Sequence, residues 1–317
     1  MLQTVNLKIS SFVLLEDVAQ TKVVVLPNVQ TFSFVVEDGE PGYQLASHIS
    51  CPCASQTSFI YEVDAEDMVA DQDIFPTSAL WNTLVRQYTK SPVQAVILET
   101  KRSQDPIVAC NLVFQSSDMS VAKLGVKVSG DMADEDEDEM TTQDILLKVF
   151  SQAFRTVRNH PLLSNVKRLR IGNTIPISEF EEPTRMVNEV GRLFKSVGPL
   201  DELILSRCDL RPYLSSFLDL GLPELNYIRG PITFPPIKEL TILHPPILGG
   251  GEYIAAIVEL AKSQHTLGIP FERVTIHTWG FPRKAVEMLN PWVGEVNCYE
   301  ERLNIPVSRS TGFMDVS

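Results

Sequence analysis

Short alternations of apolar and polar residues recur along the chain and predict β-strands. The clearest alternation runs from Leu200 to Leu210 and fits the leucine-rich-repeat template L-x-x-L-x-L-x-x-[NC]-x-L at every fixed position. Because side chains alternate between the two faces of a strand, Leu203 and Leu205 are expected to point inward together. Cys208 occupies the template position at which the backbone turns away from the strand.

Weaker copies of this unit occur in both halves of the chain and predict about nine strands. The copies begin at Leu2, Val29, Ala54, Val93, Val121, Val166, Ile237 and Phe271, and the copy at Ala54 is a poor match. The inward positions 169, 203, 240 and 274 lie 34, 37 and 34 residues apart. Standard leucine-rich repeats are roughly 20–29 residues long, so each unit must carry an insert such as a helix. Residues 107–114 are expected to add a strand, as a hairpin with residues 93–100.

Helical periodicity fills the intervals between these strands. In the longest such segment Phe150 and Ala153 fall on one apolar face, at a spacing typical of an amphipathic helix. Strands that alternate with helices predict a parallel sheet in an α/β protein. We therefore predict an irregular leucine-rich-repeat solenoid, a horseshoe with parallel strands on its concave face and helices outside. The predicted helices cover residues 79–90, 142–159, 184–197, 252–264 and 283–290.

The composition is that of a soluble globular protein, with 317 residues, 44% apolar and 21% charged. The net charge of −13 argues against unspecific nucleic-acid binding, which needs Lys and Arg to neutralise phosphates. No apolar run approaches the ~20 residues of a membrane-spanning helix, and the start of the chain lacks a signal-peptide pattern. We therefore expect no nucleic-acid or membrane partner. The five cysteines are interpreted as reduced thiols, which predicts a cytoplasmic or nuclear location.

The negative charge is concentrated in the first half of the chain. Residues 140–317 carry 19 charges of each sign, whereas residues 131–139 alone carry seven carboxylates. Like charges at this density repel one another and cannot be buried, so residues 130–141 are expected to be a disordered acidic insert. The alternative is that this insert binds a basic tail of a partner. Residues 62–73 are expected to form a second acidic loop.

The chemistry-bearing residues do not form a recognisable catalytic motif. A metal site at His48, Cys51 and Cys53 is conceivable, but a proline-rich loop with small thiols is the favoured interpretation. The glycines at 249–251 lack the Gly-Lys-Ser/Thr ending of a phosphate-binding loop and favour the start of a helix. We therefore predict no catalytic, cofactor-binding or metal-binding residue and no enzymatic activity. The alternative is an α/β enzyme with an unrecognised pocket.

Several segments beyond the strand template carry a family resemblance. They are residues 26–29, 41–52, 85–88, 91–93, 166–171, 255–262, 268–276, 291–294 and 298–301. They resemble a family of fungal F-box/leucine-rich-repeat proteins, and the resemblance covers roughly residues 1–301. It implies a protein-interaction horseshoe, which we place over residues 1–302. Residues 303–317 are polar, with Ser and Asn, and we expect them to be a mobile tail.

In that family an F-box docks on the Skp-type adaptor of a cullin ubiquitin ligase. The present sequence shows no Leu-Pro-led three-helix segment of the F-box type, which argues against a Skp-type adaptor as a partner. Substrate recognition for an SCF-type ubiquitin ligase is therefore implied by the resemblance alone. A truncated family member without retained activity is the alternative.

The positions between the inward residues define a candidate binding surface. Their side chains are expected on the concave face, because they alternate with the inward positions. Charged groups mixed with exposed aliphatic side chains suit a protein partner better than a polyanion, and ordinary solvated strand positions are the alternative. We therefore predict a non-enzymatic protein-interaction scaffold. The candidate protein-binding residues are Arg168, Arg170, Glu202, Ile204, Ser206, Glu239, Thr241, Leu243, Arg273, Thr275 and His277.

Overall fold

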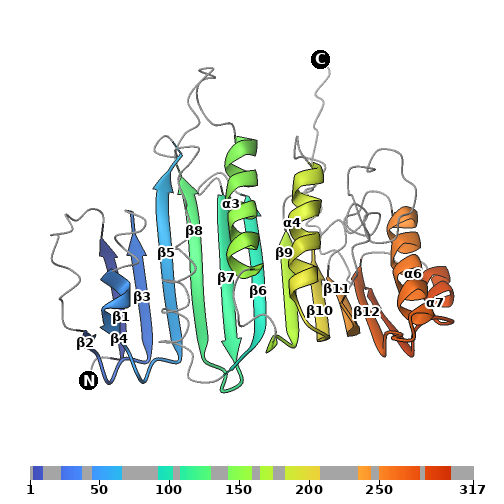
Figure 1. Ribbon diagram of the computed structural model, residues 1–317, viewed down its shortest axis with the longest axis horizontal. Coiled ribbons are helices and arrows are strands. Elements are labelled where there is room, and N and C mark those ends of the chain that lie inside the picture. The colour runs from blue at the N-terminus through green and yellow to red at the C-terminus, as the bar shows by residue number, and fades with distance from the viewer. Residues whose placement is uncertain are drawn as a thin grey trace, which may run out of the picture.

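One large sheet runs through the part of the chain that the computed structural model describes (Figure 1). The protein is a mixed α/β structure, and this sheet has eleven strands in the order β1-β3-β5-β8-β7-β6-β9-β10-β11-β12-β13. The prediction of an α/β protein with a mostly parallel sheet is confirmed. The described residues are 3–9, 23–37, 45–65, 92–102, 108–129, 142–158, 165–173, 183–207, 235–243, 250–278 and 283–300.

Nine of the eleven strands of the large sheet coincide with the repeated units of the sequence. Their bounds are β1 Thr4–Ile9, β3 Thr31–Val36, β5 Gln56–Asp64, β6 Val93–Arg102, β7 Val108–Ser116, β8 Val121–Ser129, β9 Arg168–Asn173, β10 Leu200–Ser206, β11 Ile237–Leu243, β12 Arg273–Thr278 and β13 Glu295–Glu300. β2 (Val24–Val25) and β4 (Ile49–Ser50) form a separate two-stranded parallel sheet. The sequence pattern did not predict β2, β4 or β13.

The centre of the large sheet departs from the order of a solenoid. In a solenoid each repeat contacts its neighbours in sequence, whereas here β8 lies beside β5, and β6 lies beside β9. The hairpin expected between residues 93–100 and 107–114 is confirmed by the antiparallel pairing of β6 with β7. β7 also pairs antiparallel with β8, and it is the single reversed strand among those described. Since antiparallel strands can be joined by short turns, β6, β7 and β8 form a meander that enters the sheet as a block.

The strands from β9 to β13 follow the order of the sequence and are all parallel. Their register aligns the inward positions of successive units. Leu203 pairs with Leu169 on one side and with Leu240 on the other. Leu240 in turn pairs with Val274, so the alignment expected from the template is observed across four consecutive strands.

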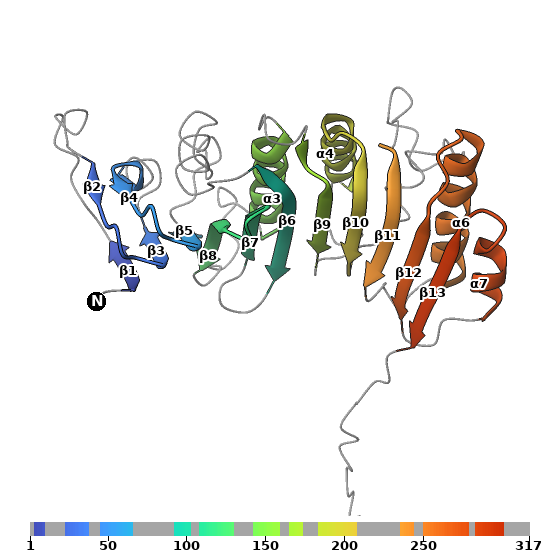
Figure 2. The same cartoon turned by 90° about the horizontal axis from the view of Figure 1, so that it is seen from below.

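Four helices are described: α3 (Thr142–Arg158), α4 (Pro183–Ser196), α6 (Gly250–Thr266) and α7 (Arg283–Leu289). All four lie on the same side of the large sheet (Figure 2). Their bounds agree with the predicted helices to within two residues, and the predicted helix over 79–90 lies outside the described residues. None of the described helices covers the other face of the sheet.

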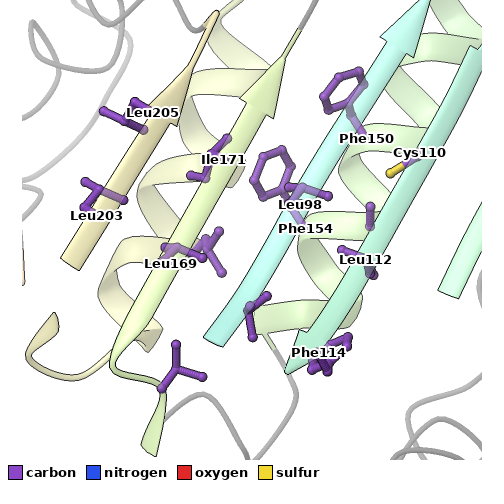
Figure 3. Close-up of a cluster of buried hydrophobic side chains, with 14 of the residues drawn as sticks. Leu98, Cys110, Leu112, Phe114, Phe150, Phe154, Leu169, Ile171, Leu203 and Leu205 are labelled. Atoms are coloured by element: carbon purple, nitrogen blue, oxygen red, sulfur yellow. The ribbon is translucent and has the colours of Figure 1, made fainter. Parts of the chain in front are cut away.

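The hydrophobic core lies between the sheet and these helices. In α3 the rings of Phe150 and Phe154 are stacked with 6.3 Å between their centroids. They pack against buried side chains of β6, β7 and β9, including Leu98, Leu112 and Leu169 (Figure 3). The inward positions of the central strands are therefore buried by α3, and the alternate positions are left for the opposite face.

The structure describes the start of one acidic segment and four of the five cysteines. The predicted loop over 62–73 is wrong at its start, because Glu62 and Asp64 belong to β5, where Tyr61 and Val63 are buried. Residues 66–73, the insert 130–141 and the tail 303–317 lie outside the described residues. Cys51 and Cys110 are buried, Cys53 and Cys298 are exposed, and none of these four forms a disulfide. Burial raises the pKa of the Cys51 thiol to about 11 and also raises that of Cys110.

Candidate protein-binding surface

The face of the large sheet opposite the four helices carries every candidate residue from the sequence, and we call it the open face. Strand pairing arranges these residues in three parallel rows. The first row contains Arg168, Glu202, Glu239 and Arg273; the second contains Arg170, Ile204, Thr241 and Thr275; the third contains Ser206, Leu243 and His277. The predicted residues of these rows lie on strands β9 to β12. Each row continues beyond them, onto β13 on one side and onto β6 on the other.

The extensions of these rows were not predicted. On β13 they end at Glu295, Asn297 and Tyr299. Towards the other edge, the second row continues through Ile97, Val113, Lys123, Ser58, Ser33 and Asn6. The third continues through Gly172, Glu99, Asn111, Gly125, Ile60, Val35 and Lys8. Applying the same alternation rule to the first half of the sequence could have found them.

Charged side chains in the first row compensate one another between β11 and β13. The Arg273 guanidinium lies 3.3 Å from a carboxylate oxygen of Glu239 and 3.0 Å from one of Glu295. A hydrogen bond donated by Asn297 and the charge of Arg273 lower the pKa of Glu295. Because exposed ion pairs contribute about 0–1 kcal/mol, this network defines the charge pattern of the surface more than its stability.

An aromatic pair lies at the β13 end of the open face. The rings of His277 and Tyr299 are stacked with 4.8 Å between their centroids. Tyr299 is 52% exposed, and Leu243 precedes the pair in the same row. Ile204 lies half-buried in the neighbouring row. Tyrosine is among the residue types that most often dominate the energy of protein–protein binding.

A carboxylate bridge connects three strands near the β1 end. Glu62 on β5 accepts hydrogen bonds from Lys127 at 2.7 Å and from Lys8 at 2.9 Å. Lys8 also lies 3.2 Å from Glu37. The hydrogen bond from Lys127, followed by that from Lys8, lowers the pKa of Glu62, and the hydrogen bonds to Glu62 and Glu37 raise the pKa of Lys8. The bridge thus gives Glu62 a structural partner on each side.

Replacing Glu62 with glutamine is expected to reduce the loss of stability in acid. The folded-state pKa of Glu62 lies below its ordinary value of 4.5. The ionised Glu62 carboxylate therefore stabilises the folded protein fully above about pH 4.5. This stabilisation is lost as the pH falls through the folded-state pKa. We expect the free energy of unfolding to fall by up to roughly 1 kcal/mol more in the wild type than in E62Q. Urea unfolding between pH 5 and pH 3 measures this, with exposed Glu287→Gln as control, and a parallel decline of wild type and E62Q would contradict it.

The middle of the open face contains a second set of polar groups. The Arg170 guanidinium lies 3.2 Å from a carboxylate oxygen of Glu99. The side chain of Asn111 lies over Gly125, since a Cβ atom at this glycine would come within 3.0 Å of Asn111 Oδ1. Burial, followed by repulsion from Lys127, lowers the pKa of Lys123, and the charge of Glu99 opposes that effect.

Comparisons of this chain with family models, with curated proteins and with solved structures found no match. The surface therefore has to be interpreted from its own residues. Within the described ranges, no group of three or more His, Cys, Asp or Glu side chains could hold a metal ion, and His48, Cys51 and Cys53 lie in those ranges. Gly250 and Gly251 are the first residues of α6. No described helix is both long and apolar enough to cross a membrane.

Proposed function

We propose that this protein is a non-enzymatic scaffold that binds another protein on the open face of its sheet. The observation that carries the proposal is the composition of that face. Half-buried aliphatic side chains such as Ile204, the exposed Tyr299 and a mixture of charges of both signs occur together on one surface. Aromatic and aliphatic groups supply the buried area of a protein interface, and polar groups form its rim.

We also propose that the fold is an irregular leucine-rich-repeat solenoid with a meander in its centre. The parallel, sequential strands from β9 to β13 and the alignment of Leu169, Leu203 and Leu240 support this proposal. The inserted block from β6 to β8 is the irregular part. Solenoids commonly use an extended strand face as a binding surface, which agrees with the proposed role of the open face.

A more specific role is substrate recognition for an SCF-type ubiquitin ligase. Its support is the resemblance of the sequence to fungal F-box/leucine-rich-repeat proteins, which is an argument by analogy. Binding of a Skp-type adaptor is a separate property, because it depends on an F-box and not on the open face. Partner binding on the open face and the role in a ubiquitin ligase can therefore fail independently.

Affinity purification of tagged protein from fungal cells tests both proposals. We expect partners of the wild type to be lost with Ile204→Asp on the open face. They should be retained with Leu267→Asp, a matched change at a residue that follows α6 and is 66% exposed. Equal recovery of the same partners with both variants would overturn binding on the open face. Absence of a Skp-type adaptor and a cullin from the wild-type sample would overturn the ligase role only.

A further inference from the structure

Several basic side chains gather at the centre of the open face in a chain with a net charge of −13. Lys123 on β8 and Arg168 and Arg170 on β9 all lie on this face. Arg170 pairs with Glu99, whereas no carboxylate of the described residues forms an ion pair with Lys123 or Arg168. Lys127 lies on the same face of β8, but its charge is paired with Glu62. Lys123 and Arg168 therefore have no ion pair among the described residues, and the Arg170 guanidinium, with five N–H donors, keeps donors beyond the one that faces Glu99.

Burial makes the lack of a partner costly at Lys123. This side chain is half-buried, and the same burial lowers its pKa. A buried ammonium group is stabilised by a carboxylate within hydrogen-bonding distance, because a hydrogen bond between charged groups is roughly twice as strong as a neutral one. The charge of Glu99 favours the ammonium form, but Glu99 itself is paired with Arg170. A carboxylate of a bound ligand would supply the ion-pair partner that Lys123 lacks among the described residues.

Lys123 and Arg170 lie at opposite ends of one segment of the second row. Strand pairing places Val113 and Ile97 between them, in the order Lys123, Val113, Ile97, Arg170. Neighbouring strands are about 4.7–4.9 Å apart, so the two cationic positions are about 14 Å apart. The two aliphatic side chains between them are half-buried and face the same side of the sheet. The segment is therefore apolar in the middle and cationic at both ends.

These dimensions fit an extended acidic peptide. Successive residues of an extended chain rise about 3.3–3.4 Å, so residues i and i+4 lie on one face and about 13 Å apart. Carboxylates at these two positions reach Lys123 and Arg170, and an apolar residue at i+2 rests on Val113 and Ile97. A nucleic acid backbone has no apolar residue that would rest on Val113 and Ile97.

We propose that the row from Lys123 to Arg170 binds an extended segment of a partner protein with two acidic residues four positions apart and an apolar residue midway. The inference rests on the proposed function, because it names the chemistry of the partner that the open face would bind. Arg168, two residues before Arg170 on the same strand face, supplies a further cation for a flanking acidic group.

Selection from a displayed library of random twelve-residue peptides tests this inference. The wild type is expected to enrich Asp or Glu at positions four apart with an apolar residue between them. Lys123→Gln should lose the preference at one acidic position, whereas Lys195→Gln, an exposed cation on α4, should keep both. The enriched peptide should bind K123Q about tenfold more weakly than the wild type by fluorescence anisotropy. Circular dichroism spectra identical to that of the wild type establish that both variants are folded.

Three results would overturn the inference: no acidic preference on the wild type, an unchanged preference on K123Q, or tighter binding of a single-stranded oligonucleotide than of the enriched peptide. Any of these, together with partner loss in Ile204→Asp, would refute the acidic ligand and leave the proposed scaffold function standing. Conversely, the wild type could select the expected acidic peptides while Ile204→Asp keeps its partners. That result would support peptide binding at Lys123 and Arg170 and contradict partner binding at Ile204.

Discussion

Replacing Leu203 with aspartate is expected to unfold the protein, whereas the same replacement at Ile204 should leave it folded. Leu203 is 0% exposed and lies in the core between β10 and the helices. Truncating a buried leucine costs about 2–5 kcal/mol, and the buried carboxylate adds a further penalty of similar or larger size. Since domains are typically stable by about 5–15 kcal/mol, L203D should remove most or all of that stability.

Ile204 faces the opposite side of the same strand and is half-buried, so the cost of I204D should stay near 1 kcal/mol. Thermal unfolding followed by circular dichroism compares the two variants directly. If L203D and I204D melted at the same temperature, the side chains on the two faces of β10 would be equally buried. That outcome would contradict the placement of Leu203 in the core and of Ile204 on the open face.

Replacing Phe154 with alanine should lower the free energy of unfolding by about 3–5 kcal/mol. Phe154 is 2% exposed, and it stacks with Phe150 while α3 packs against the central strands. Deleting its ring leaves a cavity that these rigid strands cannot fill. Urea unfolding measures the loss, and Leu267→Ala, which removes a largely exposed side chain, should change stability by less than about 0.5 kcal/mol. A loss below about 1 kcal/mol for F154A would mean that α3 does not cover the centre of the sheet.

Strand positions in the second half could be predicted because their inward residues follow one template. Leu203 and Leu205 occupy the inward positions of the template and are buried as expected, whereas Ile204 between them is half-buried. β13 was missed because Val296 is followed by Cys298 at the next inward position, and flanking glutamates weaken the pattern. Local alternation identifies a strand less readily where an inward position is weakly apolar.

The order of the central strands could not be predicted from the sequence. The hairpin of β6 with β7 is a local feature and was expected, but the placement of β8 beside β5 is a choice between non-local pairings. Periodicity carries no information about that choice. The end of β5 was missed for a local reason. Glu62 was grouped with the acidic residues that follow it, and this grouping hid the alternation of the buried Tyr61 and Val63 around Glu62.

The candidate surface was predicted in part for the same reasons. Arg170 and Ile204 were found because they flank inward positions of clear repeats, and the structure places both on the open face. Lys123 was not found, although it directly precedes the inward Leu124. Its significance depends on half-burial and on the lack of an ion-pair partner, and both properties arise from strands that are distant in sequence.

Site-specific photo-crosslinking tests the proposed binding surface most directly. A photoreactive amino acid is placed at position 204 on the open face or at position 267 beyond α6, and the tagged protein is irradiated in the cells that express it. We predict a discrete crosslinked partner from position 204 and none from position 267. The same partner from both positions, or from position 267 alone, would contradict the proposal that the open face of the sheet binds a partner protein.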